Sequence, residues 1–526
     1  MKKIVVCDAI HKKGFDILRA EEDIEVFDAV GIPKNELLDV IGDADVAITR
    51  SSTDIDEKFL NAAKNLKAVV RAGVGVDNVD LDGCSKRGII AMNVPTANTI
   101  AAVELTMAHL LSTARSFPNA NNHLKLDRVW KREKWYGVEL FGKKLGVIGF
   151  GNIGSRVAVR AKAFGMDIIA YDPYIEPSKV TDLGMSYTEN FEDILSCDFI
   201  TIHTPKNKET TDIISYDEID KMKDGVRLIN CARGGLYNEK ALYEGIKSGK
   251  IAYAGIDVFS YEPATDHFLL DLDNISVTPH LGANTYESQE KIAIQAAESA
   301  ISAARGVSYP NALNLPIKTE DLPVHIVPYL ELLQKMSYFA AQINKSQVKS
   351  IKIELEGEIS EFGKSLLTFA IVGSLKDSVG DKINYVNADY VAKQKGIETL
   401  YENSQNSSAY HNKITVTLTT QKGVTSVSGT VFGDDEQRIV NINGFGFDFK
   451  PKGKMIVLKN KDVPGVIASI ATLLAQRGIN IADFRLGRGK NDNAMAVILI
   501  DDSIDKKLLE ELNSLDTCIW AEYAIL

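Results

Sequence analysis

Three side chains that could act together on a small organic acid are Arg233, Glu262 and His280, and each follows an apolar, strand-like run. An arginine binds a carboxylate through two parallel hydrogen bonds and stays charged. A histidine exchanges protons near neutral pH, and a neighbouring carboxylate stabilises its charged form. The trio predicts a site in which Arg233 clamps a carboxylate, His280 is the acid/base and Glu262 tunes His280.

Each member of this trio has an ordinary explanation when it is taken alone. A single histidine is usually a core or surface residue, and Glu262 could be a turn acid before Pro263. The spacing after three consecutive strands favours the catalytic interpretation, because parallel strands end at one edge of a sheet. No base for the neighbouring Cys231 is evident, so we expect it only to line the site.

A glycine turn, Gly149-Phe-Gly-Asn-Ile-Gly154, lies between a strand-like run and a helical pattern. The first glycine permits a tight turn, the second lets a pyrophosphate approach the backbone, and the third lets helix and strand pack closely. Asp172 comes 172 − 154 = 18 residues later, near the roughly 20 typical of a ribose-binding acid. A lone glycine pattern is often only a loop, but this context predicts NAD rather than NADP.

Composition restricts the possible partners and compartment. The chain has 526 residues, enough for about three ordinary domains, and a net charge of −11, which disfavours nucleic acid and anionic membranes as partners. Five cysteines lack C-x-x-C spacing, so we expect reduced thiols and no metal site. Neither a signal peptide nor an apolar run of membrane-spanning length is evident, and the expected location is cytoplasmic.

The order of elements predicts an α/β protein. Strands and helices alternate before about Asn93 and again after Gly149, which indicates two parallel sheets covered by helices. In the first of these, Arg50 and Arg71 end two strands, and surface salt bridges explain them as well as an anion pocket does. Two long helices are expected at 99–115 and 286–305, and the aromatic and basic segment 129–136 could pack against a second subunit.

The C-terminal part does not continue the alternating α/β pattern. A proline-containing linker begins near residue 306, and the region to about residue 452 looks like an α+β domain with no recognisable chemistry. The last stretch, 454–526, follows the order β-α-β-β-α-β of a ferredoxin-like module.

The chain resembles the D-isomer-specific 2-hydroxyacid dehydrogenases, in the long form that ends in an ACT domain. The motifs that carry the resemblance are Arg71–Asn78, Gly149–Gly154, Asn230–Gly235, Asp257–Pro263 and Pro279–Ala283, together with Asn443–Asp448, Asn460–Gly465 and Gly478–Ile481 at the C-terminal end. The resemblance implies a flavodoxin-like substrate domain (1–98 and 281–306), a Rossmann NAD domain (99–280), an intervening domain (307–452) and an ACT regulatory domain (453–526).

The resemblance also implies roles for individual residues. Contacts to NAD are implied for the fingerprint and strand-end residues Gly149, Gly151, Asn152, Ile153, Gly154, Asp172, Thr204, Cys231, Ala232, Asp257, His280, Gly282 and Ala283. Substrate contacts are implied for Arg50, Ser51, Arg71, Val74, Gly75 and Arg233. Asn460, Asp462 and Asn480 would line a serine site at a domain–domain interface. Basic residues near Arg132 and Lys134 would reach a neighbouring subunit's site.

Long members of this family oxidise 3-phosphoglycerate at the entry to serine synthesis, and the resemblance implies that activity, possible inhibition by L-serine and a tetramer built from dimers. A reductase for hydroxypyruvate, glyoxylate or 2-oxoglutarate is an alternative of the same class. An NAD(H)-sensing binding module, like the C-terminal-binding-protein corepressors, is an alternative of another class. The complete trio and the ACT-like tail disfavour this second alternative.

Overall fold

The structure, a computed structural model, describes residues 1–316, 322–404, 410–489 and 492–526. The chain divides into two compact units. The first comprises Met1–Asp54, Val70–Asn78 and Met92–Asn311, and the second comprises Ile55–Val69, Val79–Ala91 and Ala312–Leu526. The four-domain division expected from the sequence is finer and stays a prediction. Within the described ranges, every helix is too short or too polar to cross a membrane.

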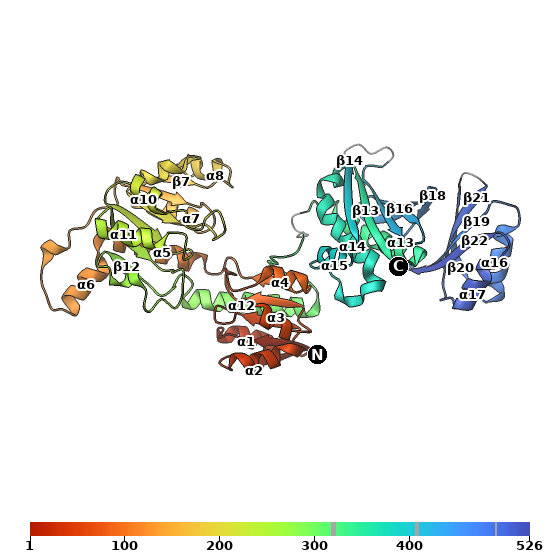
Figure 1. The fold of residues 1–526 in the computed structure, drawn as a ribbon, viewed down its shortest axis with the longest axis horizontal. Helices are drawn as coiled ribbons and strands as arrows, with labels where there is room; N and C mark the ends of the chain where they lie inside the picture. Colours follow the sequence, from red (N-terminus) through yellow and green to blue (C-terminus); the bar gives the residue numbers. More distant parts are fainter. Residues whose placement is uncertain (317–321, 405–409, 490–491) are drawn as a thin grey trace. The chain divides into compact units, whose positions relative to one another are not determined.

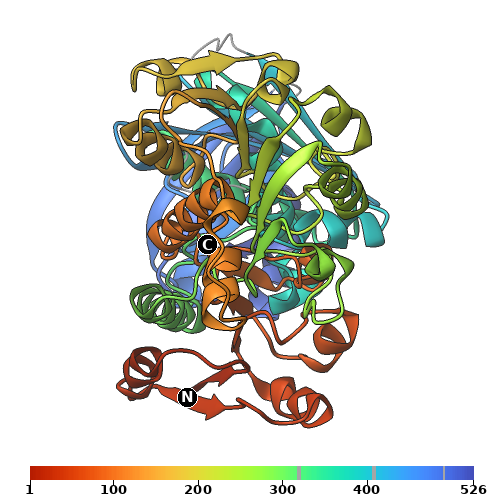
Figure 2. The same ribbon diagram turned by 90° about the vertical axis from the view of Figure 1, so that its left-hand side faces the viewer.

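The N-terminal sheet has the strand order β2-β1-β3-β4-β5 (Figure 1). Its strands are β1 (Lys2–Val6), β2 (Ile24–Asp28), β3 (Val46–Thr49), β4 (Ala68–Arg71) and β5 (Ile90–Asn93). This is the flavodoxin-like order of a doubly wound sheet, as predicted. Figure 2 shows N-terminal helices, drawn in red, on both sides of the first strands. Helix α12 (Tyr286–Arg305), the last helix of the first unit, packs against α1 (Lys12–Arg19), β1 and β3, so this late segment covers the N-terminal sheet.

The second sheet has the order β12-β11-β10-β9-β6-β7-β8. Its strands, all paired in parallel, are β6 (Lys144–Ile148), β7 (Asp167–Tyr171), β8 (Ser186–Thr188), β9 (Phe199–Ile202), β10 (Val226–Asn230), β11 (Ile251–Ile256) and β12 (Ile275–Val277). Strand order reverses between β6 and β9, where a doubly wound sheet binds its ligand. The Rossmann arrangement expected from the glycine turn is therefore confirmed.

Two helices that matter for the site are α5 (Thr99–Arg115) and α7 (Gly154–Ala163), and α5 packs on both β10 and β11. The other helices of the first unit are α2 (Lys34–Val40), α6 (Phe117–Lys125), α8 (Ser178–Thr181), α9 (Phe191–Leu195), α10 (Tyr216–Lys221) and α11 (Glu239–Ser248). The short helices α3 (Glu57–Ala62) and α4 (Leu81–Lys86) belong to the second unit.

The second unit contains a mixed sheet of order β14-β13-β15-β16-β17-β18. Its strands are β13 (Val348–Glu356), β14 (Glu398–Ser404), β15 (Lys413–Thr420), β16 (Val424–Phe432), β17 (Glu436–Ile442) and β18 (Phe445–Phe449). Helices α13 (Val327–Asn344) and α14 (Gly363–Val379) pack on each other and on this sheet, followed by α15 (Ala388–Gln394). Their apolar faces and the inward side chains of the strands form one core.

The C-terminal module has the predicted order of elements. Strands β19 (Lys454–Lys461), β20 (Ile481–Arg488), β21 (Asn493–Ile500) and β22 (Cys518–Ile525) form an antiparallel sheet of order β20-β21-β19-β22. Helices α16 (Val466–Gln476) and α17 (Lys506–Asn513) bury their apolar residues against it. The ferredoxin-like topology is confirmed.

The contact between α13 and α14 predicts a sharp effect of one methyl group. A Cβ atom at Gly373 would lie 2.3 Å from the backbone oxygen of Gln334. We expect Gly373→Ala to destabilise the protein by about 1–3 kcal/mol through overpacking, measured as a lower urea midpoint in circular dichroism. Gly446→Ala is the matched control, because a Cβ atom there meets nothing within 4 Å. Equal midpoints for the two variants would contradict the close helix packing.

Candidate active site

The acid/base pair predicted from the sequence is assembled at the ends of two neighbouring strands. Glu262 follows β11 and His280 follows β12, and these strands pair in parallel. Nδ1 of His280 lies 2.8 Å from Oε2 of Glu262. Because a carboxylate can only accept, Nδ1 carries the proton and Nε2 is left with its lone pair. His280 is therefore prepared to accept a proton at Nε2.

The Glu262 carboxylate is held on both oxygens. Its Oε1 accepts a hydrogen bond from the backbone N–H of Phe259 at 3.0 Å. Burial raises the pKa of Glu262, but the hydrogen bonds from His280 and Phe259 and the charges of His280 and Arg233 outweigh burial and leave this pKa lowered. Glu262 thus remains an anion beside the histidine.

Asp257 shapes the turn that carries His280. Its buried carboxylate accepts hydrogen bonds from the backbone N–H groups of Leu281 at 2.7 Å and Gly282 at 3.0 Å. His280 itself has φ = 53°, a left-handed conformation that a non-glycine residue adopts at a cost. Burial raises the pKa of Asp257, while hydrogen bonds from Thr278 and Leu281 and the charge of His280 oppose the rise.

Three arginines converge near this pair, as one of the two interpretations of the sequence predicted. Arg50 and Arg71 follow β3 and end β4, and Arg233 follows β10. A Cβ atom at Gly75 would lie 2.2 Å from Nη2 of Arg233, so the guanidinium lies against the Val74–Gly75 backbone. Of the predicted substrate residues, Arg50 and Arg233 are held by hydrogen bonds to Asp8 and Asp77, whereas the Ser51 side chain is exposed.

The arginine cluster is electrostatically unbalanced. Burial and, after it, the charges of Arg233 and Arg50 together lower the pKa of Arg71 to about 10, whereas Asp77 and Asp8 act in the opposite direction. The buried Nε atom of Arg71 has no hydrogen-bond partner. A buried donor without a partner and several like charges make this place suited to an anion.

The glycine turn has the geometry of a cofactor cradle. Gly149 has φ = 85°, and a Cβ atom on Gly154 would lie 2.0 Å from the Gly149 carbonyl oxygen, so both positions need glycine. A Cβ atom on Gly151 would meet nothing within 4 Å, which leaves room for a phosphate against the backbone. The following helix α7 presents its N-terminus to this space, where free N–H groups stabilise an anion.

Other predicted cofactor residues surround the same cradle. Asp172 accepts hydrogen bonds from the backbone N–H groups of Phe150 at 2.8 Å and Tyr174 at 3.0 Å, which fixes its carboxylate at the end of β7. The hydroxyl of Thr204 is buried without a partner. Burial raises the pKa of the Cys231 thiol, which is therefore a neutral lining group, as expected. These residues fit NAD.

Sequence reasoning missed several residues that hold the site together. Asp77 accepts a hydrogen bond from Nε of Arg233 at 3.1 Å, and Asn78 donates to the carbonyl oxygens of Arg50 and Thr53 at 2.7 and 2.6 Å. Asn98 precedes α5 like a helix cap but makes no capping bond, and its buried Oδ1 has no partner. In the sequence, the only indication of these roles was that Asp77, Asn78 and Asn98 are polar residues close to the strand ends of the expected anion pocket.

The three predicted effector residues are not brought together within one C-terminal module. Asn460 lies on β19 opposite Ala494, at the start of β21, and Asp462 pairs with Arg488 at 3.2 Å. Asn480 donates to Asp501, just beyond the other end of β21. At about 3.3 Å per residue, the two ends of this strand are roughly 20 Å apart. A single module therefore cannot use all three residues on one small ligand.

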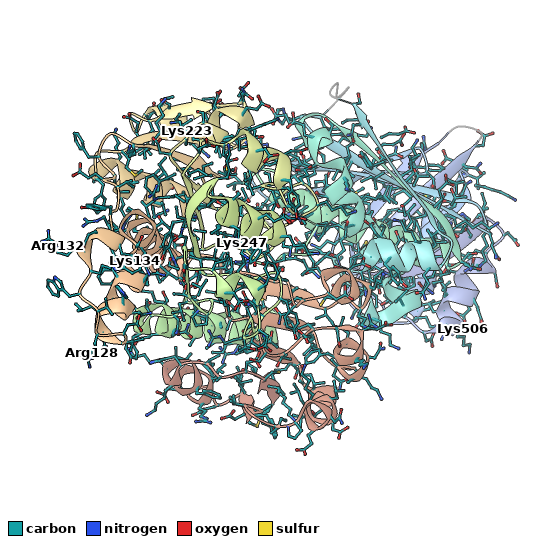
Figure 3. All side chains as sticks on the ribbon, turned by 60° about the vertical axis from the view of Figure 1, so that its left-hand side comes forward. Arg128, Arg132, Lys134, Lys223, Lys247 and Lys506 are labelled. Carbon is teal, nitrogen blue, oxygen red and sulfur yellow. The ribbon has the colours of Figure 1, made fainter. Side chains whose placement is uncertain are left out.

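The aromatic and basic segment after α6 is strongly exposed. Trp130 is 79% and Tyr136 88% exposed. Figure 3 shows Arg128, Arg132 and Lys134 extending from this segment at the edge of the view. Such exposed aromatic residues are typical of a surface that another protein covers.

Comparisons with known proteins agree with this geometry. Residues 107–282 match the NAD binding domain of the D-isomer specific 2-hydroxyacid dehydrogenases. Residues 325–443 match the D-3-phosphoglycerate dehydrogenase intervening domain, and residues 454–517 match the ACT domain.

Similar proteins cover nearly the full chain. A D-3-phosphoglycerate dehydrogenase of Bacillus subtilis is 38% identical and one of Methanocaldococcus jannaschii 37% identical, each over 98% of both chains. Among solved structures, the TT0316 protein from Thermus thermophilus is 33% identical (TM-score 0.54) and covers 59% of this chain and 99% of its own. D-lactate dehydrogenase from Aquifex aeolicus, complexed with NAD and lactic acid, is 28% identical (TM-score 0.52), covering 58% and 96%.

One buried histidine beside the site predicts how stability depends on pH. Burial lowers the pKa of His109 from 6.5 to about 4. As the pH falls, His109 therefore takes up a proton in the unfolded chain before it does so in the folded protein. The free energy of unfolding, which has its full value above pH 6.5, decreases as the pH falls towards 4. Between pH 7 and pH 5 the loss from this residue is about 2 kcal/mol.

Urea unfolding at pH 7 and pH 5 measures this loss. Both His109→Gln and His109→Asn should flatten the difference between the two pH values by about 2 kcal/mol relative to the unsubstituted protein. An unchanged difference in both variants would show that His109 is not held neutral in the folded state.

Proposed function

Because the chain belongs to the D-3-phosphoglycerate dehydrogenases of the D-isomer specific 2-hydroxyacid dehydrogenase family, we propose that it oxidises 3-phosphoglycerate to 3-phosphohydroxypyruvate with NAD. This is the entry reaction of serine synthesis. The observation that carries the proposal is the single site formed by the His280–Glu262 pair and three arginines.

The substrate has two anionic ends, and the cluster supplies cations for both. Arg233 is anchored through Nε to Asp77 and lies against Gly75, so its position is fixed before substrate binds. It clamps the carboxylate and polarises the oxygen at C2. Arg50 and Arg71 then remain for the phosphate. Prior orientation of these cations lowers the entropic cost of binding.

His280 accepts the proton that the substrate hydroxyl releases in the reaction. Its Nε2 accepts the proton of the C2 hydroxyl, and the imidazolium that forms is stabilised by the Glu262 carboxylate at Nδ1. The glycine turn and Asp172 would hold NAD, which would supply the acceptor for the hydride that leaves C2. Asp172 binds the adenosine ribose hydroxyls and disfavours a 2′-phosphate. Thr204 and Asp257 would contact the cofactor as well.

The alternatives fit less well. A reductase for hydroxypyruvate, glyoxylate or 2-oxoglutarate does not account for matches to both the intervening domain and the ACT domain. An NAD(H)-sensing module does not need Glu262 hydrogen-bonded to His280. The five cysteines are all free thiols, which supports a reducing compartment such as the cytoplasm.

We further propose that L-serine inhibits the enzyme through the ACT domain in a tetramer built from dimers. Asn460 and Asp462 lie at one end of the ACT sheet and Asn480 at the other. A complete serine site therefore needs Asn460 and Asp462 from one chain and Asn480 from another. Asp462 would bind the ammonium group, and the buried, unpartnered Oδ1 of Asn460 supports a ligand there.

An assay of NADH formation from 3-phosphoglycerate and NAD tests the activity. His280→Ala should lower kcat by about 10²–10⁴-fold, because the proton acceptor is lost, while NADH still binds with nearly unchanged affinity. His411→Ala, a surface histidine in the second unit, is the control and should retain full activity. Turnover near normal in His280→Ala would remove the acid/base assignment. No NADH from the unsubstituted enzyme would remove the function.

Serine inhibition can be tested by complementation between chains. Asp462→Ala and Asn480→Ala should each raise the serine concentration for half-inhibition by about 5–150-fold, the range of ordinary coupling free energies, with basal turnover unchanged. A mixed oligomer of the two variants carries one doubly altered site and one intact site, so it should regain partial inhibition. Absence of any recovery would contradict a site shared between chains, and absence of inhibition in the unsubstituted enzyme would contradict the regulation.

A further inference from the structure

A buried histidine on α5 is joined to the catalytic turn by a chain of hydrogen bonds. His109 lies in an otherwise apolar part of the helix and is 3% exposed. Its Nδ1 is 3.0 Å from Oγ of Ser276, and its Nε2 is 2.8 Å from Oγ1 of Thr278. Thr278 in turn contacts Oδ1 of Asp257 at 2.6 Å.

The donor and acceptor of each bond in this hydrogen-bond network follow from the carboxylate of Asp257, at which the network ends. The Asp257 carboxylate can only accept, so the Thr278 hydroxyl donates to it. Thr278 can then only accept from His109, which places the proton of His109 on Nε2. Nδ1 of His109 carries a lone pair and accepts from the hydroxyl of Ser276. All the donors therefore point towards Asp257.

We propose that His109 is a positioning residue: through Thr278 it orients the Asp257 carboxylate, and Asp257 holds the backbone turn that presents His280 to the substrate. This inference rests on the proposed function, because His280 is the proton acceptor of that reaction. His109 itself is buried and is not one of the residues assigned to substrate or cofactor. No residue of the glycine turn or the arginine cluster takes part.

Two features of the turn show why such support is needed. His280 has a left-handed backbone conformation, which persists only where neighbouring bonds enforce it. The enforcing bonds run from the N–H groups of Leu281 and Gly282 to the same Asp257 carboxylate. Misplacing a catalytic group by about 1 Å can lower the rate about 10²-fold. The orientation of Asp257 therefore affects the rate through the position of His280.

The surroundings keep the histidine in the required neutral form. His109 is hydrogen-bonded to Ser276 and Thr278 and lies against Gly255, which is also next to the Thr113 side chain. None of these groups is charged, and burial is the cause that lowers the pKa of His109 to about 4. The Asp257 carboxylate is linked to His109 only through Thr278 and is itself faced by His280 and Cys231. The chain of donors therefore stays intact throughout the working pH range.

A pair of similar substitutions separates the hydrogen bond from the packing. The amide nitrogen of His109→Gln can reach the position of Nε2 and donate to Thr278, whereas His109→Asn reaches only the position of Nδ1. We expect His109→Asn to lower kcat by up to about tenfold, the upper end of the effect of losing one neutral hydrogen bond. His109→Gln should stay within about threefold of the unsubstituted enzyme, and KM for 3-phosphoglycerate should change less than about twofold in both, because the arginines are untouched.

A double-mutant cycle tests whether His109 acts through Thr278. Thr278→Val removes the hydroxyl with little change in shape, and Thr278→Ser keeps it. If the proposal is right, His109→Asn costs nothing further in kcat once Thr278→Val is present, and Thr278→Ser behaves like the unsubstituted enzyme. Additive losses in the cycle, or equal losses in His109→Asn and His109→Gln, would show a general packing role and overturn the proposal.

Two readouts do not depend on turnover. Nitrogen NMR of the histidine rings in the cofactor-free protein should report His109 as the Nε2–H form, and the Nδ1–H form would contradict the chain of donors. NADH binding, followed by fluorescence, should weaken in His109→Asn and in Thr278→Val but not in His109→Gln. If the enzyme proves inactive on 3-phosphoglycerate, the function fails, while these measurements still decide whether His109 orients Asp257.

Discussion

The hydrogen bond between Nδ1 of His280 and the Glu262 carboxylate is the interaction on which the proposed chemistry depends. It fixes the tautomer of the imidazole, so Nε2 is a proton acceptor. The bond forms because the two residues follow β11 and β12, whose parallel register brings their carboxyl ends side by side. The constraint is therefore one of sheet topology: chemistry from distant parts of the chain meets only where strands end together.

The anion pocket shows a cost that function imposes on stability. Three arginines lie close together. Burial, together with repulsion from Arg233 and Arg50, lowers the pKa of Arg71 to about 10. Two acids, Asp8 and Asp77, offset part of that repulsion without cancelling it. Complete neutralisation would stabilise the fold but would remove the excess positive charge that draws in a doubly anionic substrate.

Much of the architecture was predictable because local patterns and global fold agree. The helices at 99–115 and 286–305 have the bounds that the apolar spacing and flanking residues indicated. The glycine turn also behaved as its spacing predicted. The pairing of Asp77 with Arg233 was not predictable, because 156 residues separate them and any acid on that edge was a candidate.

The network of His109 was hidden for a different reason. A histidine among apolar residues of a helix looks like a satisfied core residue, and its partners lie 167 and 169 residues away on another element. Likewise, the three predicted effector residues of the ACT domain come from two neighbouring motifs but do not lie at one end of the sheet. Sequence spacing gives the residue types of a site, but strand register decides which of them meet.

Buried polar atoms without partners give independent support for the sites. Arg71 Nε, Thr204 Oγ1 and Asn460 Oδ1 lie in residues to which the sequence had already assigned substrate, cofactor and effector. Leaving such atoms unpaired costs free energy, so a bound ligand is a natural partner. The hydroxyls of Thr49, Ser374 and Tyr523 are also buried and unpaired, yet they belong to no predicted site. An unpaired atom therefore indicates a ligand only where charge and backbone geometry converge on the same space, as they do around Arg71 and the Gly149 turn.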